Sequence, residues 1–117
     1  MRTFFIALLL TVFTTGFAQT GQQTPQEKLE SDIKNNTVTL YILGGFAARV
    51  YEGDAEFQEK YRVKYHDFGC LAPVNLNFYK DYNLLVYAYL NATHGTEWQS
   101  RIRPNSIGWE NWDGKEK

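Results

Sequence analysis

The sequence predicts a small α/β domain, a two- or three-stranded sheet with a parallel βαβ unit and about four helices. Residues 37–43 are β-branched and apolar, as in a strand that is covered on both sides, and residues 62–68 are expected to form a second strand; each stretch is followed by glycine. Between them, Phe57 and Tyr61 lie four residues apart, which places them on one face of a helix. A strand, a helix and a strand in that order favour parallel pairing of the two strands through a crossover.

The first eighteen residues have the three parts of a secretory signal peptide. Arg2 provides a basic start, residues 4–13 form an apolar stretch, and Ala18 provides a small residue at the junction. The apolar stretch is too short to span a membrane, which takes roughly 20 residues. We therefore expect residues 1–18 to be removed during export, leaving a mature chain that is periplasmic or secreted.

The composition of the mature chain excludes several classes of function. Without Arg2 it carries 11 basic and 13 acidic residues, so it lacks the positive charge that binding to nucleic acid or to an anionic membrane requires. Its length suits one domain, and no later segment is apolar enough to span a membrane. Cys70 is the only cysteine, so no internal disulfide can form, and no cysteine at the junction could carry a lipid.

The mature chain begins with a polar leader and a helix, together residues 19–36. Residues 19–23 show no apolar pattern, and we expect them to be mobile. Thr24 is suited to cap the helix, Pro25 fits its first position, and Glu27 completes a capping box. The helix should run to about Lys34.

The central part of the chain contains the longest expected helix, residues 77–93. Residues 46–51, before the second helix, are extended or irregular, and Asp54 is expected to cap that helix. Gly95 is suited to end the long helix with a positive φ. The apolar residues of the long helix recur at helical spacing: Phe78, Tyr82, Leu85, Val86, Tyr89 and Leu90.

The carboxyl-terminal part is expected to hold a short helix and an edge strand. Thr96 should cap the helix, which contains Trp98 and stops at Pro104. Residues 107–109 suit a third strand at the edge of the sheet, and residues 113–117 are expected to fray.

One stretch of the chain resembles a known family. Residues 56–61 read Glu-Phe-Gln-Glu-Lys-Tyr, and residues 65–70 read Tyr-His-Asp-Phe-Gly-Cys. Together they resemble the FEKKY domain, a small domain of bacterial proteins that is named for its Phe-Glu-Lys-Lys-Tyr run. Further positions similar to that pattern are Gly44, Gly45, Gly53, Asp54, Val63, Tyr82, Asn83, Tyr89, Leu90, Gly95, Trp98, Arg103, Ile107 and Gly108.

The likeness covers roughly residues 38–112, and residues 37–112 form the expected FEKKY-like domain. Gln58 and Glu59 replace Glu and Lys of the family motif, on the helix side away from Phe57. The family has no assigned activity. The resemblance therefore implies a fold and a bacterial origin, and it implies no catalytic residues.

The candidate site lies at the carboxyl end of the second strand, where ligands bind in open α/β sheets. His66, Asp67 and Cys70 meet the chemical needs of a thiol enzyme, in which the histidine activates the sulfur. Candidate ligand-binding residues are Gly44, Gly45, Gly69 and Arg103.

A structural role is also possible for the cysteine, for the tryptophans and for the residues that could bind a metal. A lone cysteine is commonly a small apolar residue of the core, and we expect Cys70 to be buried there. Trp109 and Trp112 could stack on sugars, but we expect them to cover the core. We expect no metal and no other cofactor, because the available ligand types match no compact zinc pattern: His66, Asp67, Cys70, His94 and Glu97.

The sequence therefore favours a small exported domain that binds an envelope component or a partner protein without catalysis. Two alternatives stay open. One is a Cys70-dependent thiol enzyme that is assisted by His66, and the other is a small inhibitor or immunity-type protein.

Overall fold

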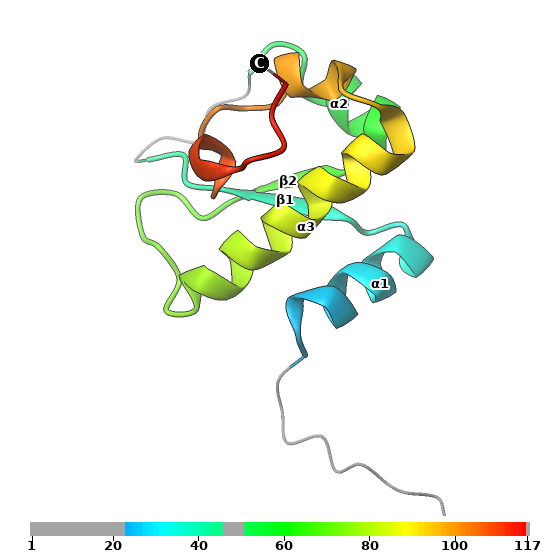
Figure 1. Ribbon diagram of the computed structural model, residues 1–117. Coiled ribbons are helices and arrows are strands. Elements are labelled where there is room, and N and C mark those ends of the chain that lie inside the picture. The colour runs from blue at the N-terminus through cyan, green and yellow to red at the C-terminus, as the bar shows by residue number, and fades with distance from the viewer. Residues whose placement is uncertain (1–22, 46–50, 117) are drawn as a thin grey trace, which may run out of the picture.

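The two central strands pair in parallel, as the sequence predicts. The structure is a computed structural model, and it describes residues 23–45 and 51–116. Strand β1 (Thr39–Ile42) lies beside β2 (Lys64–Asp67), and helix α2 (Asp54–Tyr61) comes between them in the chain (Figure 1). The expected parallel βαβ unit is confirmed.

In the described residues, two further α-helices and two 3-10 helices lie around this unit. Helix α3 runs diagonally across the two strands and packs against β1 and α1 (Figure 1). Within the part of the chain that the structure describes, no helix is both long and apolar enough to span a bilayer. The bounds of these elements are Pro25–Asn35 for α1, Leu76–His94 for α3, and Glu97–Ser100 and Trp109–Asn111 for the two 3-10 helices η1 and η2.

The core lies between the sheet and α3 and is rich in aromatic rings. Tyr87 of α3 is fully buried and lies against Trp98 of η1, with ring centroids 6.0 Å apart. Trp109 and Trp112 pack on these two rings, which confirms that the carboxyl-terminal indoles cover the core. Such rings supply much apolar area per residue, which suits a short chain without a disulfide. Other residues with no exposed surface are Leu40, Ile42, Tyr82, Asn83, Val86 and Leu90.

Helix α1 begins as its capping signals predict. The hydroxyl of Thr24 accepts a hydrogen bond of 3.2 Å from the backbone N–H of Glu27, and Pro25 is the first helical residue. The helix continues to Asn35, one residue beyond the expected end, and Asn36 stops it with φ +57°. Asparagine tolerates that left-handed conformation better than most residues.

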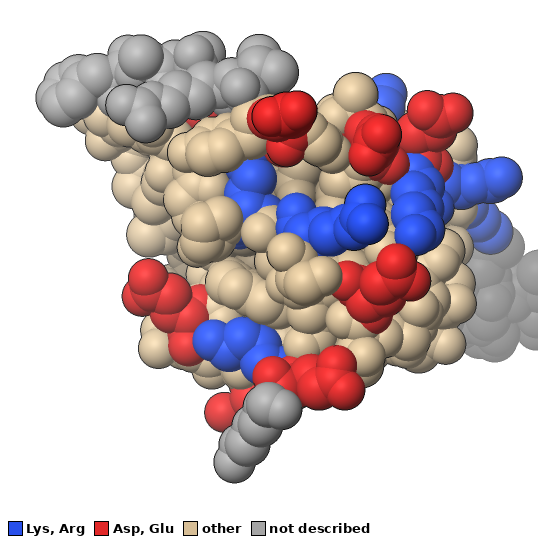
Figure 2. Space-filling view, turned by 90° about the horizontal axis from the view of Figure 1, so that it is seen from above, with Lys and Arg blue, Asp and Glu red and all other residues tan. Residues whose placement is uncertain are grey.

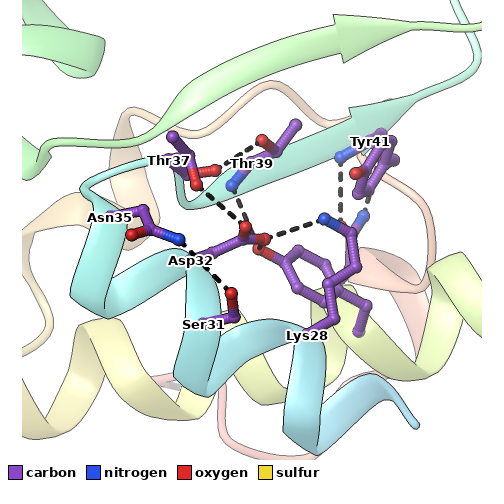
Figure 3. Close-up of polar contacts among 9 residues, drawn as sticks. Lys28, Ser31, Asp32, Asn35, Thr37, Thr39 and Tyr41 are labelled. Atoms are coloured by element: carbon purple, nitrogen blue, oxygen red, sulfur yellow. Dashed lines mark hydrogen bonds and ion pairs between the residues drawn. The ribbon is translucent and has the colours of Figure 1, made fainter. Parts of the chain in front are cut away.

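Asp32 then fastens α1 to the rest of the fold (Figure 3). Its carboxylate accepts hydrogen bonds from Lys28 (2.8 Å), Thr37 (2.8 Å) and Tyr82 (2.6 Å). Tyr82 in turn accepts from the backbone N–H of Thr39, at the start of β1. Burial opposes the ionisation of Asp32, but the three hydrogen bonds outweigh it and hold the pKa of this carboxyl below its usual value.

The prediction of a third strand at residues 107–109 is wrong. A single antiparallel bridge joins Ser106 to Ile42, and the chain then turns into η2. The side chain of Asn83 explains the difference, because it donates to the backbone oxygen of Ile107 over 3.0 Å. That side chain occupies the position a neighbouring strand would need for continued pairing.

The expected cap at the start of α2 is also wrong. Gly53, with φ +93°, is the capping residue, and Asp54 is the first residue of the helix. The carboxylate of Asp54 instead accepts from the backbone N–H of Tyr51 and binds Arg103. Thr96 precedes η1 as predicted, but its side chain makes no capping hydrogen bond.

Several expectations concern segments outside the described residues. These are the signal peptide, residues 1–18, most of the polar leader, residues 19–22, and the extended or irregular residues 46–50. In the carboxyl-terminal tail, where we expect fraying, Glu116 donates its backbone N–H to the side chain of Gln99 over 2.7 Å.

Candidate functional site at the carboxyl ends of the strands

The two strands end side by side, and a carboxylate joins the loops that follow them. Ile42 lies opposite Asp67 in the register. One oxygen of Asp67, Oδ1, accepts backbone hydrogen bonds from Gly44 (2.8 Å) and Gly69 (2.7 Å). Gly45 donates to the backbone oxygen of Gly69 over 3.2 Å. The structure thus brings together four of the predicted site residues.

These contacts hold the end of the sheet together. An ionised carboxylate that accepts two amide N–H groups forms hydrogen bonds stronger than those between neutral groups. Gly44 permits the close approach, because a Cβ atom at this position would overlap the carboxylate of Asp67. The protein's own side chain therefore occupies the place between the two glycine turns where a ligand was expected.

Replacing Gly44 with alanine should lower the free energy of unfolding by about 2 kcal/mol, because the methyl group displaces the carboxylate from its donors. Urea denaturation measures the loss. The control is a double-mutant cycle with Asp67→Ala: in that background, Gly44→Ala should have a smaller effect. Equal effects in both backgrounds would show that the carboxylate is not what Gly44 accommodates.

His66 does not join Asp67 in a catalytic pair. Successive side chains of a strand point to opposite faces, so the imidazole and the neighbouring carboxylate diverge. The exposed ring of His66 lies edge-on against Phe68 and Tyr41, with centroids 4.8 and 5.6 Å apart. Within the described part of the chain, no hydrogen bond links His66 to Cys70. The arrangement does not orient the imidazole toward the thiol.

The prediction that Cys70 packs in the core is wrong, because its side chain is exposed. The chain leaves the sheet at Gly69, whose φ of +73° turns it outward before the cysteine is reached. Cys70 consequently lies in the loop that connects β2 to α3, outside the apolar interior.

Arg103 is already engaged inside the domain. Its guanidinium Nε donates to Asp54 Oδ1 over 3.0 Å, and its Nη2 bonds the other carboxylate oxygen. The group also lies over the rings of Tyr51 and Tyr65, 4.3 and 5.1 Å from their centroids. At 8% exposure, Arg103 is positioned to hold α2 against the segment that follows η1.

Electrostatics agrees with this structural role. Burial alone would raise the pKa of Asp54, but the Arg103 guanidinium and the Tyr51 N–H outweigh it and lower the pKa. Asp54 in turn raises the pKa of Arg103. Both groups stay ionised and paired.

The remaining metal-ligand candidates are scattered. His94 packs its ring against Tyr61, with centroids 5.2 Å apart, and Glu97 pairs with Lys60 at 3.4 Å. Over residues 23–45 and 51–116, no three His, Cys, Asp or Glu side chains are placed to hold a metal ion together.

The face above α2 and η1 carries charges of both signs. Lys and Arg side chains form a short band across it, with Asp and Glu on either side (Figure 2). One hollow of about 350 Å³ on α2 shows the same mixture, since Glu56 and Glu59 lie beside Lys60 and Arg101. Acidic side chains border the basic band, so this face does not present the uniformly positive surface that would favour an anionic ligand.

The structure also exposes an apolar surface that the sequence did not predict. Leu71 and Val74, which follow Cys70, are large apolar residues that are exposed to solvent. The signal that could have found them is the lack of any Asp, Glu, Lys or Arg from residue 68 to residue 79. An uncharged stretch suggests burial by default, and only the structure shows that part of it is exposed.

The carboxyl ends of the strands form a closed structural junction, the exposed thiol lies beyond it, and the adjoining loop is apolar. No family model, no curated protein and no solved structure matches the chain.

Proposed function

We propose that the protein is a small exported domain that works by non-covalent binding of an envelope component or partner protein. The engagement of Asp67 is the observation that carries the proposal. Both Gly44 and Gly69 donate to its Oδ1 atom, so the carboxylate that could have oriented His66 is already used within the fold. A thiol enzyme needs a base that is held near the sulfur, whereas in the part of the chain that the structure describes the ring of His66 packs on Phe68 and Tyr41.

Exposed apolar side chains also support binding. Soluble monomers rarely leave contiguous apolar surface in water unless it serves recognition. Leu71 and Val74 lie three residues apart on one loop, and both side chains are exposed. A small inhibitor or immunity-type protein would be one form of this function, because it too acts by occupying a partner.

Export and family membership are parts of the proposal. The basic start, the apolar stretch and Ala18 support cleavage after residue 18 and a periplasmic or secreted mature chain. The resemblance to the FEKKY domain over residues 38–112 supports a bacterial origin. Neither the resemblance nor the leader names a ligand.

The thiol enzyme is the second candidate, because Cys70 is exposed and a reagent can reach it. Its weakness is the position of His66, whose ring packs on Phe68 and Tyr41. The two candidates predict different effects of replacing Cys70: the replacement should abolish the activity of a thiol enzyme and leave non-covalent binding unchanged.

An envelope-binding assay tests the proposal. The purified mature chain is titrated onto isolated cell envelopes of its source, and the bound fraction is measured after sedimentation. We expect saturable binding that Cys70→Ser and His66→Gln leave unchanged, because neither side chain carries out a reaction. An unrelated exported protein of similar size is the control. Absence of saturable binding, or a saturable activity that Cys70→Ser abolishes, would overturn the proposal.

A further inference from the structure

A side-chain amide from a helix bonds the middle of each strand on the side that faces away from the other strand, which we call the outer edge. On β1, Oδ1 of Asn83 in α3 accepts from the N–H of Tyr41 over 3.0 Å. On β2, Oε1 of Gln58 in α2 accepts from the N–H of Tyr65 over 3.0 Å. The outer edge of β1 is covered further, because Ile107 donates its backbone N–H to the carbonyl oxygen of Tyr41.

Within the described residues, no strand lies along the outer edge of β2. The sheet that these residues form has two strands, β1 and β2. The N–H groups of Lys64 and Phe68 bond carbonyl oxygens on the β1 side, each over 2.9 Å. Because backbone groups alternate along a strand, those of Tyr65 and Asp67 face outward. A row of outward-facing N–H and C=O groups is a template for pairing with another chain.

The course of the chain brings Gln58 to this edge. Arg62 ends α2 with φ +56°, in the left-handed region that non-glycine residues seldom occupy. The chain then enters β2, where Tyr65 comes within hydrogen-bond distance of Gln58, seven residues earlier. Phe57 and Tyr61 of the same helix are buried, whereas Gln58 is half-buried. The position of Gln58 therefore follows from the backbone turn, and its side chain bonds the strand without joining the apolar core.

The outer edge of β2 fits the same edge of a second copy of the chain. In antiparallel pairing about a two-fold axis, Tyr65 lies opposite Tyr65 of the copy, and such a pair exchanges two N–H···O bonds. In that register Lys64 lies opposite His66, and Asp67 lies opposite an uncharged residue, so no two ammonium or two carboxylate groups oppose each other. Gln58 prevents both central bonds, because its oxygen takes the Tyr65 N–H in each copy.

We propose that Gln58 blocks the outer edge of β2 against pairing with β2 of a second copy, and that this contact keeps the protein monomeric. The four-residue length of β2 and the exposed Lys64 act in the same direction, since short strands and edge lysines discourage pairing. This inference is independent of the proposed function, which concerns a different molecule.

The test measures self-association of the mature chain by sedimentation velocity over a series of concentrations. We expect wild type to stay monomeric and Gln58→Ala to dimerise at least about tenfold more tightly, because two hydrogen bonds become available to the pair. Gln26→Ala is the matched control, since it makes the same change at an exposed position of α1, and it should stay monomeric. Gln58→Glu keeps an oxygen that can accept from Tyr65, and it should also stay monomeric.

Hydrogen exchange locates the association. The Tyr65 amide should be protected in wild type, because Gln58 is its acceptor. In dilute, monomeric Gln58→Ala it should exchange at least about tenfold faster, and its protection should return at concentrations where the variant dimerises. Circular dichroism and thermal melting check that each variant folds. If Gln58→Ala does not fold, Gln58→Met replaces it, because methionine keeps the length of the side chain and lacks the amide.

Four results would contradict the inference. The first is a folded Gln58→Ala that stays monomeric at every concentration, and the second is a wild-type dimer that protects the β2 amides. The third is association of Gln58→Ala without protection of Tyr65, which would place the contact on another surface. The fourth is equal association of Gln58→Glu and Gln58→Ala, which would show that the acceptor oxygen does not block the edge. None of these results changes the outcome of the envelope-binding assay, so the proposed function is tested separately.

Discussion

Asp54→Ala is expected to lower the free energy of unfolding by about 3–5 kcal/mol, because it removes the carboxylate that pairs with the buried guanidinium of Arg103. Arg103 is 8% exposed, and its Nε lies 3.0 Å from Asp54 Oδ1. The rings of Tyr51 and Tyr65 on the guanidinium exclude the water that could otherwise solvate it. Equilibrium urea denaturation measures the loss, and it should also appear as a lower melting temperature.

Two controls separate the buried charge from other effects. Glu56→Ala removes an exposed carboxylate from the same helix, and it should change stability by less than about 0.5 kcal/mol. An Asp54→Leu/Arg103→Met double variant removes both charges, and it should recover much of the stability that Asp54→Ala loses. A loss below about 1 kcal/mol for Asp54→Ala would show that the pair does not hold α2 in place.

The same pair predicts how stability depends on pH. The pKa of Asp54 is lowered in the folded protein, because Arg103 and the Tyr51 N–H favour the ionised form more than burial opposes it. Its stabilising contribution is therefore complete above the unfolded pKa of about 3.9 and is lost as the pH falls through the folded value. Asp32, whose pKa is also lowered, contributes with the same sign. Asp54→Ala should flatten the acid limb of the stability curve.

Asn83→Ala is expected to lower the free energy of unfolding by about 3–4 kcal/mol, since a buried N–H loses its partner and a cavity forms. The Oδ1 atom of Asn83 accepts from Tyr41 N–H over 3.0 Å, and its Nδ2 donates to Tyr41 O over 2.8 Å. The amide side chain thus bonds the edge of β1 as a neighbouring strand would. Its second Nδ2 bond, to Ile107, ties the carboxyl-terminal segment to the same edge.

Hydrogen exchange and denaturation together check this role. The Tyr41 amide should exchange faster in Asn83→Ala than in wild type, beyond the change that the lower global stability predicts. Asp81→Ala, an exposed substitution on the same helix, is the control and should be nearly neutral. If Asn83→Ala loses less than about 1 kcal/mol, Asn83 does not replace a strand.

The parallel unit and the long helix were predictable because they depend on local signals. Glycines close both strands, and the apolar residues of α3 recur with helical periodicity. The course of the carboxyl-terminal segment was not predictable, because it depends on contacts between residues that are distant in the sequence. Residue 107 starts no strand because Asn83, twenty-four positions earlier, takes its carbonyl oxygen.

The candidate site was predictable in location and unpredictable in its chemistry. Parallel pairing puts Gly44, Gly69 and Asp67 at one edge of the sheet, as the topology requires. Asp67 bonds the backbone rather than a ligand because its Oδ1 atom lies within hydrogen-bond distance of the N–H groups of Gly44 and Gly69. Sequence spacing alone does not predict these distances. For Cys70 the usual burial preference of cysteine pointed inward, and the turn at Gly69 reversed it.

The rate at which Cys70 reacts with iodoacetamide at neutral pH tests most directly whether the end of the sheet supports binding or chemistry. Because the thiol is exposed and His66 packs elsewhere, the folded protein should react about as fast as the urea-unfolded chain, and His66→Gln should leave the rate unchanged. A native rate at least about tenfold above the unfolded rate, which falls in His66→Gln, would show an activated nucleophile and contradict the account.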